Sequence, residues 1–286
     1  MTNFIKSSIL CALLIFVDRS LSLACTTFCL DNENLPVCGR NFDWRLGDGH
    51  ILINKRGVAK TAISVQPDDV NTRLSWVSAY GSATFNLFGR EFPLGGMNEA
   101  GLVIESMMLD KTQYPSKDSR PEIMVSQWVQ YQLDNFSRVE DVIASDSKIR
   151  IQPSRDSKLQ FLICEQSGIC ATIEFIEGEL IYHANERVPV KTLTNSLYAD
   201  SLSFWKKEIL PKSDKNKSIE RFILSAKMVK GYDPHAMGKP IEYAFNILKK
   251  VEHDSFKTQW SIVYDIAHLT IHFRTYGNQK IRYFNF

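Results

Sequence analysis

The sequence has no apolar run long enough to cross a membrane as a helix, for which about 20 residues are needed. The stretch from Ile9 to Val17 is too short, and no later segment approaches that length. A strong excess of one charge is also absent, because the formal net charge at pH 7 is only +2. We therefore expect neither a membrane anchor nor a nucleic-acid partner.

Low-complexity segments, internal repeats and linkers are likewise missing. Apolar residues make up 44% of the chain and charged residues 23%, which is an ordinary composition for a globular protein. After a leader at residues 1–24, the length suits one domain spanning residues 25–286.

Histidines are few and scattered, and none lies in the local signature of a papain-like or caspase-like protease. His268 and His272 would share one face of a strand, but no third ligand is evident. The cysteines lack the paired CxxC spacing of a structural zinc site. We therefore predict no metal ion and no cofactor.

The first 24 residues have the features of a secretory signal peptide. Lys6 supplies the positive charge, the apolar run follows, and Ser22-Leu23-Ala24 places small residues at the third and first positions before a cut. This pattern predicts an exported protein, periplasmic or secreted, whose mature chain begins at Cys25.

Three interpretations of that terminal cysteine remain open. It could be an ordinary disulfide-bonded or buried cysteine, as secreted cysteines usually are. It could carry a lipid anchor, but Ser22 and Leu23 reverse the expected order of a large and a small residue. It could also be a nucleophile, since a terminal cysteine combines a thiol with a free α-amine whose pKa is about 8.

The number of cysteines favours a free thiol. Apart from Cys11 in the leader, the cysteines are odd in number, so one should lack an intramolecular partner. Cys164 and Cys170 flank a hairpin-like segment, and Cys29 and Cys38 flank another. Two local disulfides, Cys29–Cys38 and Cys164–Cys170, would leave Cys25 unpaired.

Blocks of strand-like and helix-like sequence alternate along the chain. Short β-type runs fill the first half, and Ser119 with Glu122 forms a capping-box pattern that predicts a helix beginning near Pro121. Further helical stretches are predicted at 138–145, 202–210, 219–229 and 241–251, with strands between and after them. The pattern indicates an α+β fold of antiparallel sheets with helices packed outside them.

Five motifs occur in a characteristic order: "CTTFC", "GRNFDW", "GGMNEAGL", "TLTNSLY" and "ERF". Together they resemble the choloylglycine hydrolase family, the cysteine branch of the N-terminal nucleophile hydrolases, which includes penicillin V acylases and bile salt hydrolases. The segments "WVQYQLDNFSRVEDVIAS" and "MLDKTQYP" are more similar to the exported penicillin V acylase-like branch. The resemblance implies a four-layer αββα sandwich.

The resemblance also implies roles for individual residues. Cys25 matches the nucleophile, Arg40 an arginine beside the thiol, and Asp43 the aspartate that holds the α-amine. Asn195 matches the asparagine that donates to the oxyanion, and Arg221 an arginine that orients the site from a helix.

One position departs from the family pattern. The second oxyanion position falls at Met108, where bile salt hydrolases have asparagine and some acylases have tyrosine or tryptophan. A methionine side chain cannot donate a hydrogen bond, although its backbone N–H can. We expect Met107 and Met108 at the edge of the acyl pocket, which favours an apolar acyl group.

The predicted function is hydrolysis of linear carbon–nitrogen amide bonds in a small-molecule substrate through a Cys25 thioester. Penicillin V acylase-like or acyl homoserine lactone acylase-like activity is favoured for an apolar acyl group. The alternatives are a conjugated bile salt hydrolase and a catalytically silent secreted binding protein on the same scaffold. The prediction leaves room for a homo-oligomer.

Overall fold

The computed structural model describes residues 24–31, 36–63, 73–153, 157–208, 217–252 and 257–286. The predicted signal peptide, residues 1–24, lies outside this part of the chain except for Ala24. Among the described residues, no helix is both long and apolar enough to cross a bilayer.

One antiparallel sheet joins the two ends of the described chain, so that "CTTFC" and "GRNFDW" lie beside the C-terminal strands. We call it the N-terminal sheet. Its strand order is β14-β1-β2-β15-β16-β17. The strands are β1 (Thr26–Leu30), β2 (Val37–Asp43), β14 (Thr192–Leu193), β15 (Thr258–Asp265), β16 (Thr270–Thr275) and β17 (Asn278–Asn285).

A second antiparallel sheet, the middle sheet, faces the first and has the order β13-β12-β11-β8-β7-β6-β3. Its strands are β3 (His50–Asn54), β6 (Ser82–Asn86), β7 (Pro93–Asn98), β8 (Val103–Met108), β11 (Leu159–Cys164), β12 (Cys170–Ile176) and β13 (Glu179–Ala184). Two small pairs complete the strands: β4 (Ala59–Thr61) with β5 (Ser75–Val77), and β9 (Glu122–Ile123) with β10 (Arg150–Ile151).

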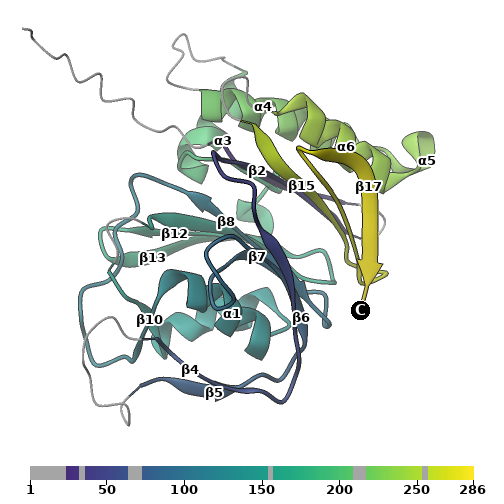
Figure 1. Ribbon diagram of the computed structural model, residues 1–286. Coiled ribbons are helices and arrows are strands. Elements are labelled where there is room, and N and C mark those ends of the chain that lie inside the picture. The colour runs from purple at the N-terminus through teal and green to yellow at the C-terminus, as the bar shows by residue number, and fades with distance from the viewer. Residues whose placement is uncertain (1–23, 32–35, 64–72, 154–156, 209–216, 253–256) are drawn as a thin grey trace, which may run out of the picture.

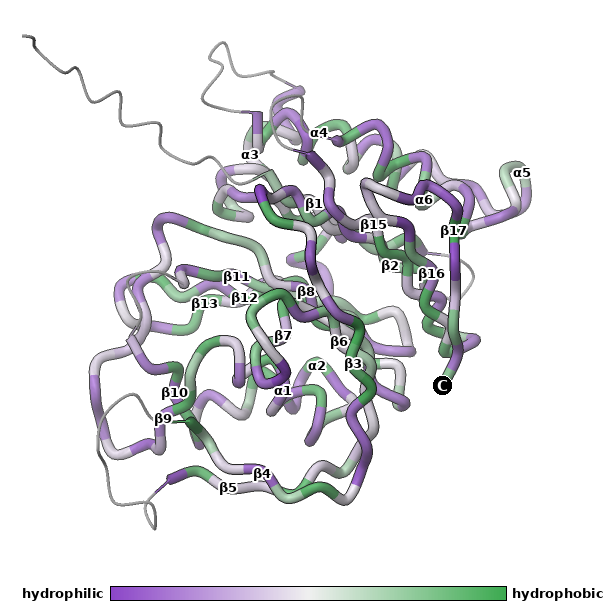
Figure 2. Tube along the Cα trace, viewed as in Figure 1, coloured by the Kyte–Doolittle hydropathy of each residue, from purple (hydrophilic) through white to green (hydrophobic). Residues whose placement is uncertain are grey.

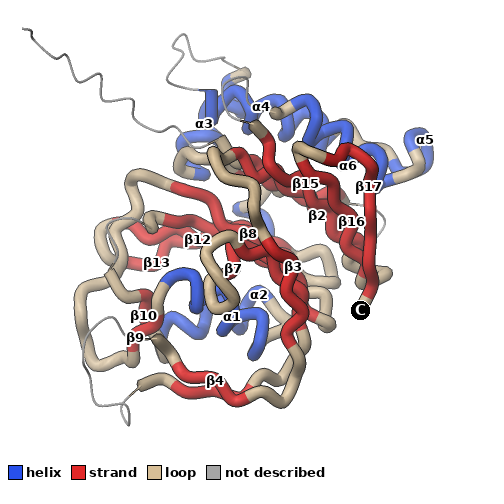
Figure 3. The backbone as a smooth tube through the Cα atoms, viewed as in Figure 1, coloured by secondary structure: helices blue, strands red, loops and turns tan. Residues whose placement is uncertain are grey.

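Helices cover the outer face of each sheet (Figures 1 and 3). The helix α1 packs on β7 and β8, whereas α4 and α6 pack on β1, β2 and β15. The α-helices are α1 (Val125–Asn135), α2 (Val139–Ala144), α3 (Tyr198–Lys207), α4 (Lys217–Lys230), α5 (Pro234–Met237) and α6 (Pro240–Lys250), and short 3₁₀ turns span Ser145–Ser147 and Asn185–Arg187. Figure 2 shows hydrophobic and hydrophilic residues alternating along α4 and α6, as expected for helices buried on one side.

Three hydrophobic clusters separate the layers. Because side chains alternate across a strand, Cys29 of β1 faces the middle sheet while Phe28 and Leu30 face α6. On β8, Val103 lies in the cluster between the sheets and Ile104 lies in the cluster beneath α1. This arrangement is the αββα sandwich, so the predicted fold class is confirmed.

The predicted capping box at Ser119 and Glu122 was wrong. The helix α1 begins at Val125 after Met124, and Glu122 belongs to strand β9. Glu122 pairs in register with Arg150 of β10, and the two side chains form an ion pair. A long-range ion pair and strand pairing therefore outweigh the local helix-start signal.

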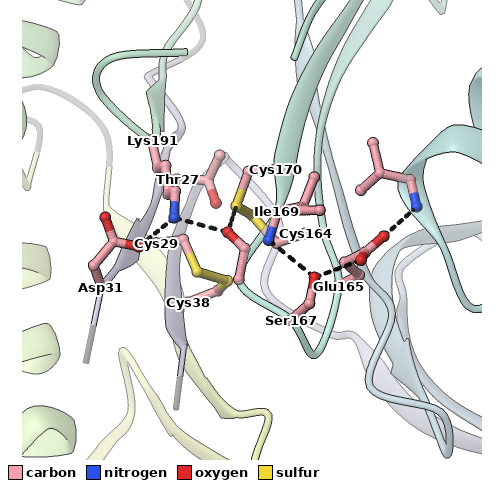
Figure 4. Close-up of a disulfide and its surroundings, with 12 residues drawn as sticks. Thr27, Cys29, Asp31, Cys38, Cys164, Glu165, Ser167, Ile169, Cys170 and Lys191 are labelled. Atoms are coloured by element: carbon pink, nitrogen blue, oxygen red, sulfur yellow. Dashed lines mark hydrogen bonds and ion pairs between the residues drawn. A yellow bond between two sulfur atoms is a disulfide. The ribbon is translucent and has the colours of Figure 1, made fainter. Parts of the chain in front are cut away.

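The four cysteines predicted to pair lie together between the sheets (Figure 4). Cys29 and Cys38 are directly opposite on β1 and β2 with Cα atoms 4.0 Å apart, and Cys164 and Cys170 are opposite on β11 and β12 at 4.1 Å. Both pairs have their sulfur atoms at bonding distance. The pairing stays a chemical prediction that the geometry supports.

Candidate active site

Cys25 lies immediately before β1, buried at the edge of the cluster between the two sheets. Among the described cysteines it is the one free thiol. The antiparallel register places Thr27 opposite Arg40, which brings Arg40 diagonally beside Cys25. The hairpin of β1 and β2 therefore sets the first contact of the site.

Arg40 extends from β2 toward the middle sheet and is only 1% exposed. Its Nη2 atom lies 3.9 Å from Cys25 Sγ and donates to the Ser106 carbonyl at 2.9 Å. Its Nη1 atom donates to Glu105 Oε2 at 2.6 Å. A guanidinium in this position favours the thiolate form of Cys25.

Asp43 is completely buried at the end of β2. Its Oδ1 atom accepts a hydrogen bond from the Thr258 hydroxyl, whereas its Oδ2 atom has no partner among the described residues. Burial raises the pKa of this carboxyl to about 7, although the Thr258 hydroxyl, Arg221 and Arg40 act in the opposite direction. The unused oxygen is an acceptor available to a nearby cation.

Asn195 and Arg221 reach the site from the loop after β14 and from helix α4. Arg221, on α4, donates through Nη2 to Asn195 Oδ1 at 3.0 Å and to the Cys25 carbonyl at 3.5 Å. Its Nε atom donates to the Thr26 hydroxyl at 3.2 Å. Asn195 follows β14 and donates through Nδ2 to the Met108 carbonyl at 2.9 Å. An amide NH₂ has two donors, so Nδ2 has a second N–H to offer.

Met107 and Met108 end strand β8, but successive side chains of a strand point to opposite faces. Met107 lies in the cluster between the sheets, together with Cys25. Met108 lies four residues after Ile104, so its side chain points to the same face of β8, toward the helix layer. Met107 therefore lies on the same side of β8 as the thiol, while Met108 contributes its backbone carbonyl to the Asn195 contact, and the pocket edge expected at these two residues stays a prediction.

The thiol environment is balanced between opposing effects. Burial raises the pKa of Cys25, and the Asp43 charge acts in the same direction. Arg40 and the backbone N–H of Asp43 lower it. Burial also lowers the pKa of Arg221, which the charges of Asp43 and Cys25 oppose. Burial and the Asp43 charge therefore favour the protonated thiol, whereas Arg40 and the Asp43 backbone N–H favour its anion.

Sequence reasoning missed two residues of this site, Glu105 and Thr258. Glu105 is a lone charge within the apolar run "GLVIESMML", and a charged residue on a buried strand requires a partner. This lone charge could have identified Glu105 from the sequence as a residue with a buried partner. Thr258 carries no comparable signal, because its contact with Asp43 crosses from β15 to β2.

One group of side chains in the described ranges could bind a metal. The sulfur atoms of Cys29, Cys164 and Cys170 lie within 4.8 Å of one another, but each of these residues belongs to a disulfide pair. The predicted histidine pair does not form: His268 lies in a turn and contacts Asp265, whereas His272 lies on β16 beside the Tyr283 ring.

Comparison with known proteins agrees with this architecture. A curated penicillin V acylase from Pectobacterium atrosepticum is 27% identical over 263 residues, covering 82% of this chain and 67% of the relative. A penicillin V acylase structure from Agrobacterium tumefaciens superposes with a TM-score of 0.75 at 22% identity, covering 91% of this chain and 86% of that one. A variant of conjugated bile acid hydrolase from Clostridium perfringens gives a TM-score of 0.73 at 18% identity, covering 91% and 92%.

The family assignment follows from the sequence match itself. Residues 25–226 match the family described as linear amide C–N hydrolases, choloylglycine hydrolase family. The match begins at the predicted first residue of the mature chain and includes Arg40, Asp43, Asn195 and Arg221. The chain belongs to the choloylglycine hydrolase family of linear amide C–N hydrolases.

Proposed function

We propose that the mature protein is an exported amide hydrolase in which Cys25, as the N-terminal residue, is the nucleophile, and that it prefers N-acyl amides with an apolar acyl group. The observation that carries this proposal is the convergence on one free thiol of Arg40, Asp43, Asn195 and Arg221. Arg40 and Asp43 come from strand β2, Asn195 from a loop and Arg221 from a helix; Arg40, Asp43 and Arg221 contact Cys25, and Asn195 contacts Arg221.

The buried oxygen of Asp43 supports the role of the α-amine. Cleavage after Ala24 would convert the Cys25 amide into an amine beside the site. Asp43 contacts the thiol through its backbone N–H, and its Oδ2 atom lacks a partner among the described residues. The free amine could donate an N–H to that oxygen, which would hold its lone pair within reach of the thiol proton on Sγ.

The proposed reaction has two steps, formation of the thioester and its hydrolysis. The amine takes the thiol proton, Sγ forms a bond to the amide carbon, and the carbonyl electron pair moves to oxygen. The second N–H of Asn195 Nδ2 donates to this oxyanion, a contact worth about 3–4 kcal/mol in the transition state. The oxyanion collapses, the C–N bond breaks, and the ammonium proton goes to the leaving nitrogen. Water, deprotonated by the amine, then attacks the thioester and releases the acid and the thiol.

The acyl preference depends on the apolar surroundings of the thiol. Met107, Phe42 and Trp260 lie in the same cluster as Cys25, and the Phe42 and Trp260 rings stack at 4.6 Å. Apolar and aromatic side chains stabilise an acyl group mainly by excluding water, and they offer hydroxyl groups on the substrate no partner. This argument favours fatty or aryl-acetyl-type amides over conjugated bile salts.

A hydrolysis panel tests the proposal. It compares phenoxyacetyl amides, medium-chain fatty acyl amides, and taurine- or glycine-conjugated sterol amides, with Cys25→Ala as the blank. We expect the highest kcat/KM for the fatty or aryl-acetyl members and no turnover above the blank for Cys25→Ala. Highest kcat/KM for the sterol conjugates would overturn the acyl preference. If no member reacts, the silent binding protein becomes the better interpretation.

A further inference from the structure

Glu105 is a buried carboxylate that the proposed reaction does not use. It lies at the centre of β8 on the face directed toward the N-terminal sheet and is 1% exposed. Its Oε2 atom accepts from Arg40 at 2.6 Å, and its Oε1 atom accepts from the Tyr264 hydroxyl of β15. Glu105 therefore connects the middle sheet to two strands of the N-terminal sheet.

The backbone is shaped to admit this carboxylate. Gly95 of β7 lies directly opposite Glu105, and a Cβ atom at Gly95 would stand only 2.3 Å from Glu105 Oε2. Any side chain at position 95 would displace the carboxylate from Arg40. The two neighbouring strands thus provide a fitted position for a charge that is costly to bury without a partner.

The contacts of Glu105 set the orientation of the Arg40 guanidinium. Glu105 holds Nη1, and the Ser106 carbonyl holds Nη2, so the guanidinium is tied to β8 at both ends. With these two points fixed, Nη2 lies 3.9 Å from Cys25 Sγ. Nη1 also donates weakly to the Leu94 carbonyl of β7 at 3.4 Å, and a planar guanidinium held in this way has little freedom to leave the thiol.

The same carboxylate also offsets the Arg40 charge. Burial raises the pKa of Glu105, whereas Arg40 and the Tyr264 hydroxyl lower it; Glu105 in turn raises the pKa of Arg40 against the effect of burial. The other charged or titratable groups that act on the Cys25–Arg40 pair are Asp43 from β2, Arg221 from α4 and Tyr264 from β15. Among these groups, Glu105 is the one in direct ion-pair contact with Arg40.

We propose that Glu105 is a positioning residue that orients Arg40 against Cys25 and offsets its charge, which limits how strongly Arg40 favours the thiolate. This inference rests on the proposed role of Cys25 as nucleophile. It assigns to Glu105 both a geometric and an electrostatic effect, and the two effects can be measured separately.

The test compares Glu105→Gln with Glu105→Ala in the processed protein. Glutamine keeps an acceptor oxygen for Arg40 but removes the negative charge, whereas alanine removes both. The first readout is the rate of Cys25 alkylation by iodoacetamide against pH, with the labelled residue verified by peptide mass. The second is kcat and KM for the best substrate of the panel.

We expect the alkylation midpoint of Glu105→Gln to fall by about one pH unit or more, because Glu105 no longer offsets the Arg40 charge that favours the thiolate. Glu105→Ala should shift similarly and should also lose about tenfold or more in kcat relative to Glu105→Gln, with a smaller effect on KM, because Arg40 Nη1 loses its carboxylate acceptor and the guanidinium is held less firmly. Glu165→Gln is the matched control. Glu165 is a buried carboxylate that accepts from the Val139 N–H, and its replacement should leave the midpoint unchanged.

An unchanged midpoint in folded Glu105→Gln would overturn the proposal and leave Glu105 a purely structural residue. If neither Glu105 variant folds, Tyr264→Phe takes over the test. It removes the hydroxyl that donates to Glu105 and lowers its pKa, so the charged form of Glu105 becomes less favourable. The alkylation midpoint of Cys25 should then shift in the same direction as in Glu105→Gln, but by less. No shift in that variant would overturn the proposal equally. Alkylation does not depend on turnover, so equal hydrolysis by wild type and Cys25→Ala would refute the proposed function without deciding the role of Glu105.

Discussion

Arg221 Nη2 lies 3.0 Å from Asn195 Oδ1, and this contact fixes the orientation of the Asn195 side-chain amide. With Oδ1 held by a cation, the Nδ2 donors are directed away from Arg221, toward the Met108 carbonyl at 2.9 Å and the space beside the thiol. In the proposed mechanism the arginine would therefore act on the oxyanion through the asparagine, and the two residues would form one functional unit.

Replacing Asn195 by Leu should lower kcat by about 10²–10³-fold, because an oxyanion donor is lost. Arg221→Gln should also lower kcat, and the double variant should lose much less than the product of the two single losses. Steady-state kinetics of the three variants checks this expectation. Lys227→Gln, on the exposed face of the same helix, serves as the control and should keep wild-type kcat. Independent, multiplicative losses would contradict the coupling.

Asp43 should make the unprocessed chain less stable as the pH rises. Its folded pKa of about 7 lies above the ordinary value of 3.8, so between these values the folded state holds a proton that the unfolded state has lost. This group alone should then lower the free energy of unfolding by about 1.4 kcal/mol per pH unit.

Urea unfolding at several pH values checks this expectation, since Asp43→Asn should remove that part of the slope while the exposed Asp110→Asn should retain it. In the processed protein the adjacent ammonium should lower the pKa of Asp43 and move the window to lower pH. Equal slopes for wild type and Asp43→Asn in the unprocessed chain would show that this carboxyl is already ionised there.

A chain that retains Ala24 should fold but should not turn over substrate. Ala24 is itself buried, so the site tolerates the uncleaved peptide bond, but an amide nitrogen cannot accept the thiol proton. Intact mass identifies the N-terminus and a hydrolysis assay gives the activity. The same preparation after removal of the leader is the control. Turnover by a verified unprocessed chain would exclude the amine as the base.

Removing either predicted disulfide should destabilise the fold without abolishing the thiol chemistry. The bridges close short loops, with sequence separations of 9 and 6 residues, so each should contribute about 2–3 kcal/mol in the chain-entropy model. Denaturant unfolding of the Cys164→Ala/Cys170→Ala double variant measures the loss. Peptide mapping without reduction tests the pairing, and a bridge to Cys25 would remove the basis for a free nucleophile.

A further contact lies beside these bridges. Lys191 donates to the Gly168 carbonyl at 2.7 Å and pairs with Asp31, which joins the turn between Cys164 and Cys170 to the end of β1 (Figure 4). The two hairpins are thus connected by polar contacts as well as by sulfur packing. This connection is consistent with the disulfides stabilising the ends of the hairpins rather than the site near Cys25.

The sequence alone determined the features that depend on local pattern and motif order. Short β-type runs bounded by turn residues predicted the strands, the odd cysteine count singled out Cys25, and the motifs in register identified the family that the sequence match now shows. These signals are readable because strand alternation and hairpin pairing depend on residues close together in the chain. The start of α1 was the exception, since Glu122 is held by Arg150 from a distant segment.

Only the tertiary structure decided which side chains share the site and with what electrostatic balance. Glu105 meets Arg40 across 65 residues of sequence, and Thr258 meets Asp43 across 215. Contacts of this range arise when two sheets stack, and no local pattern encodes which buried polar groups will face each other. The pKa of Cys25 depends on those charges and on burial together, so its environment follows from the packed sandwich and not from the motif that contains it.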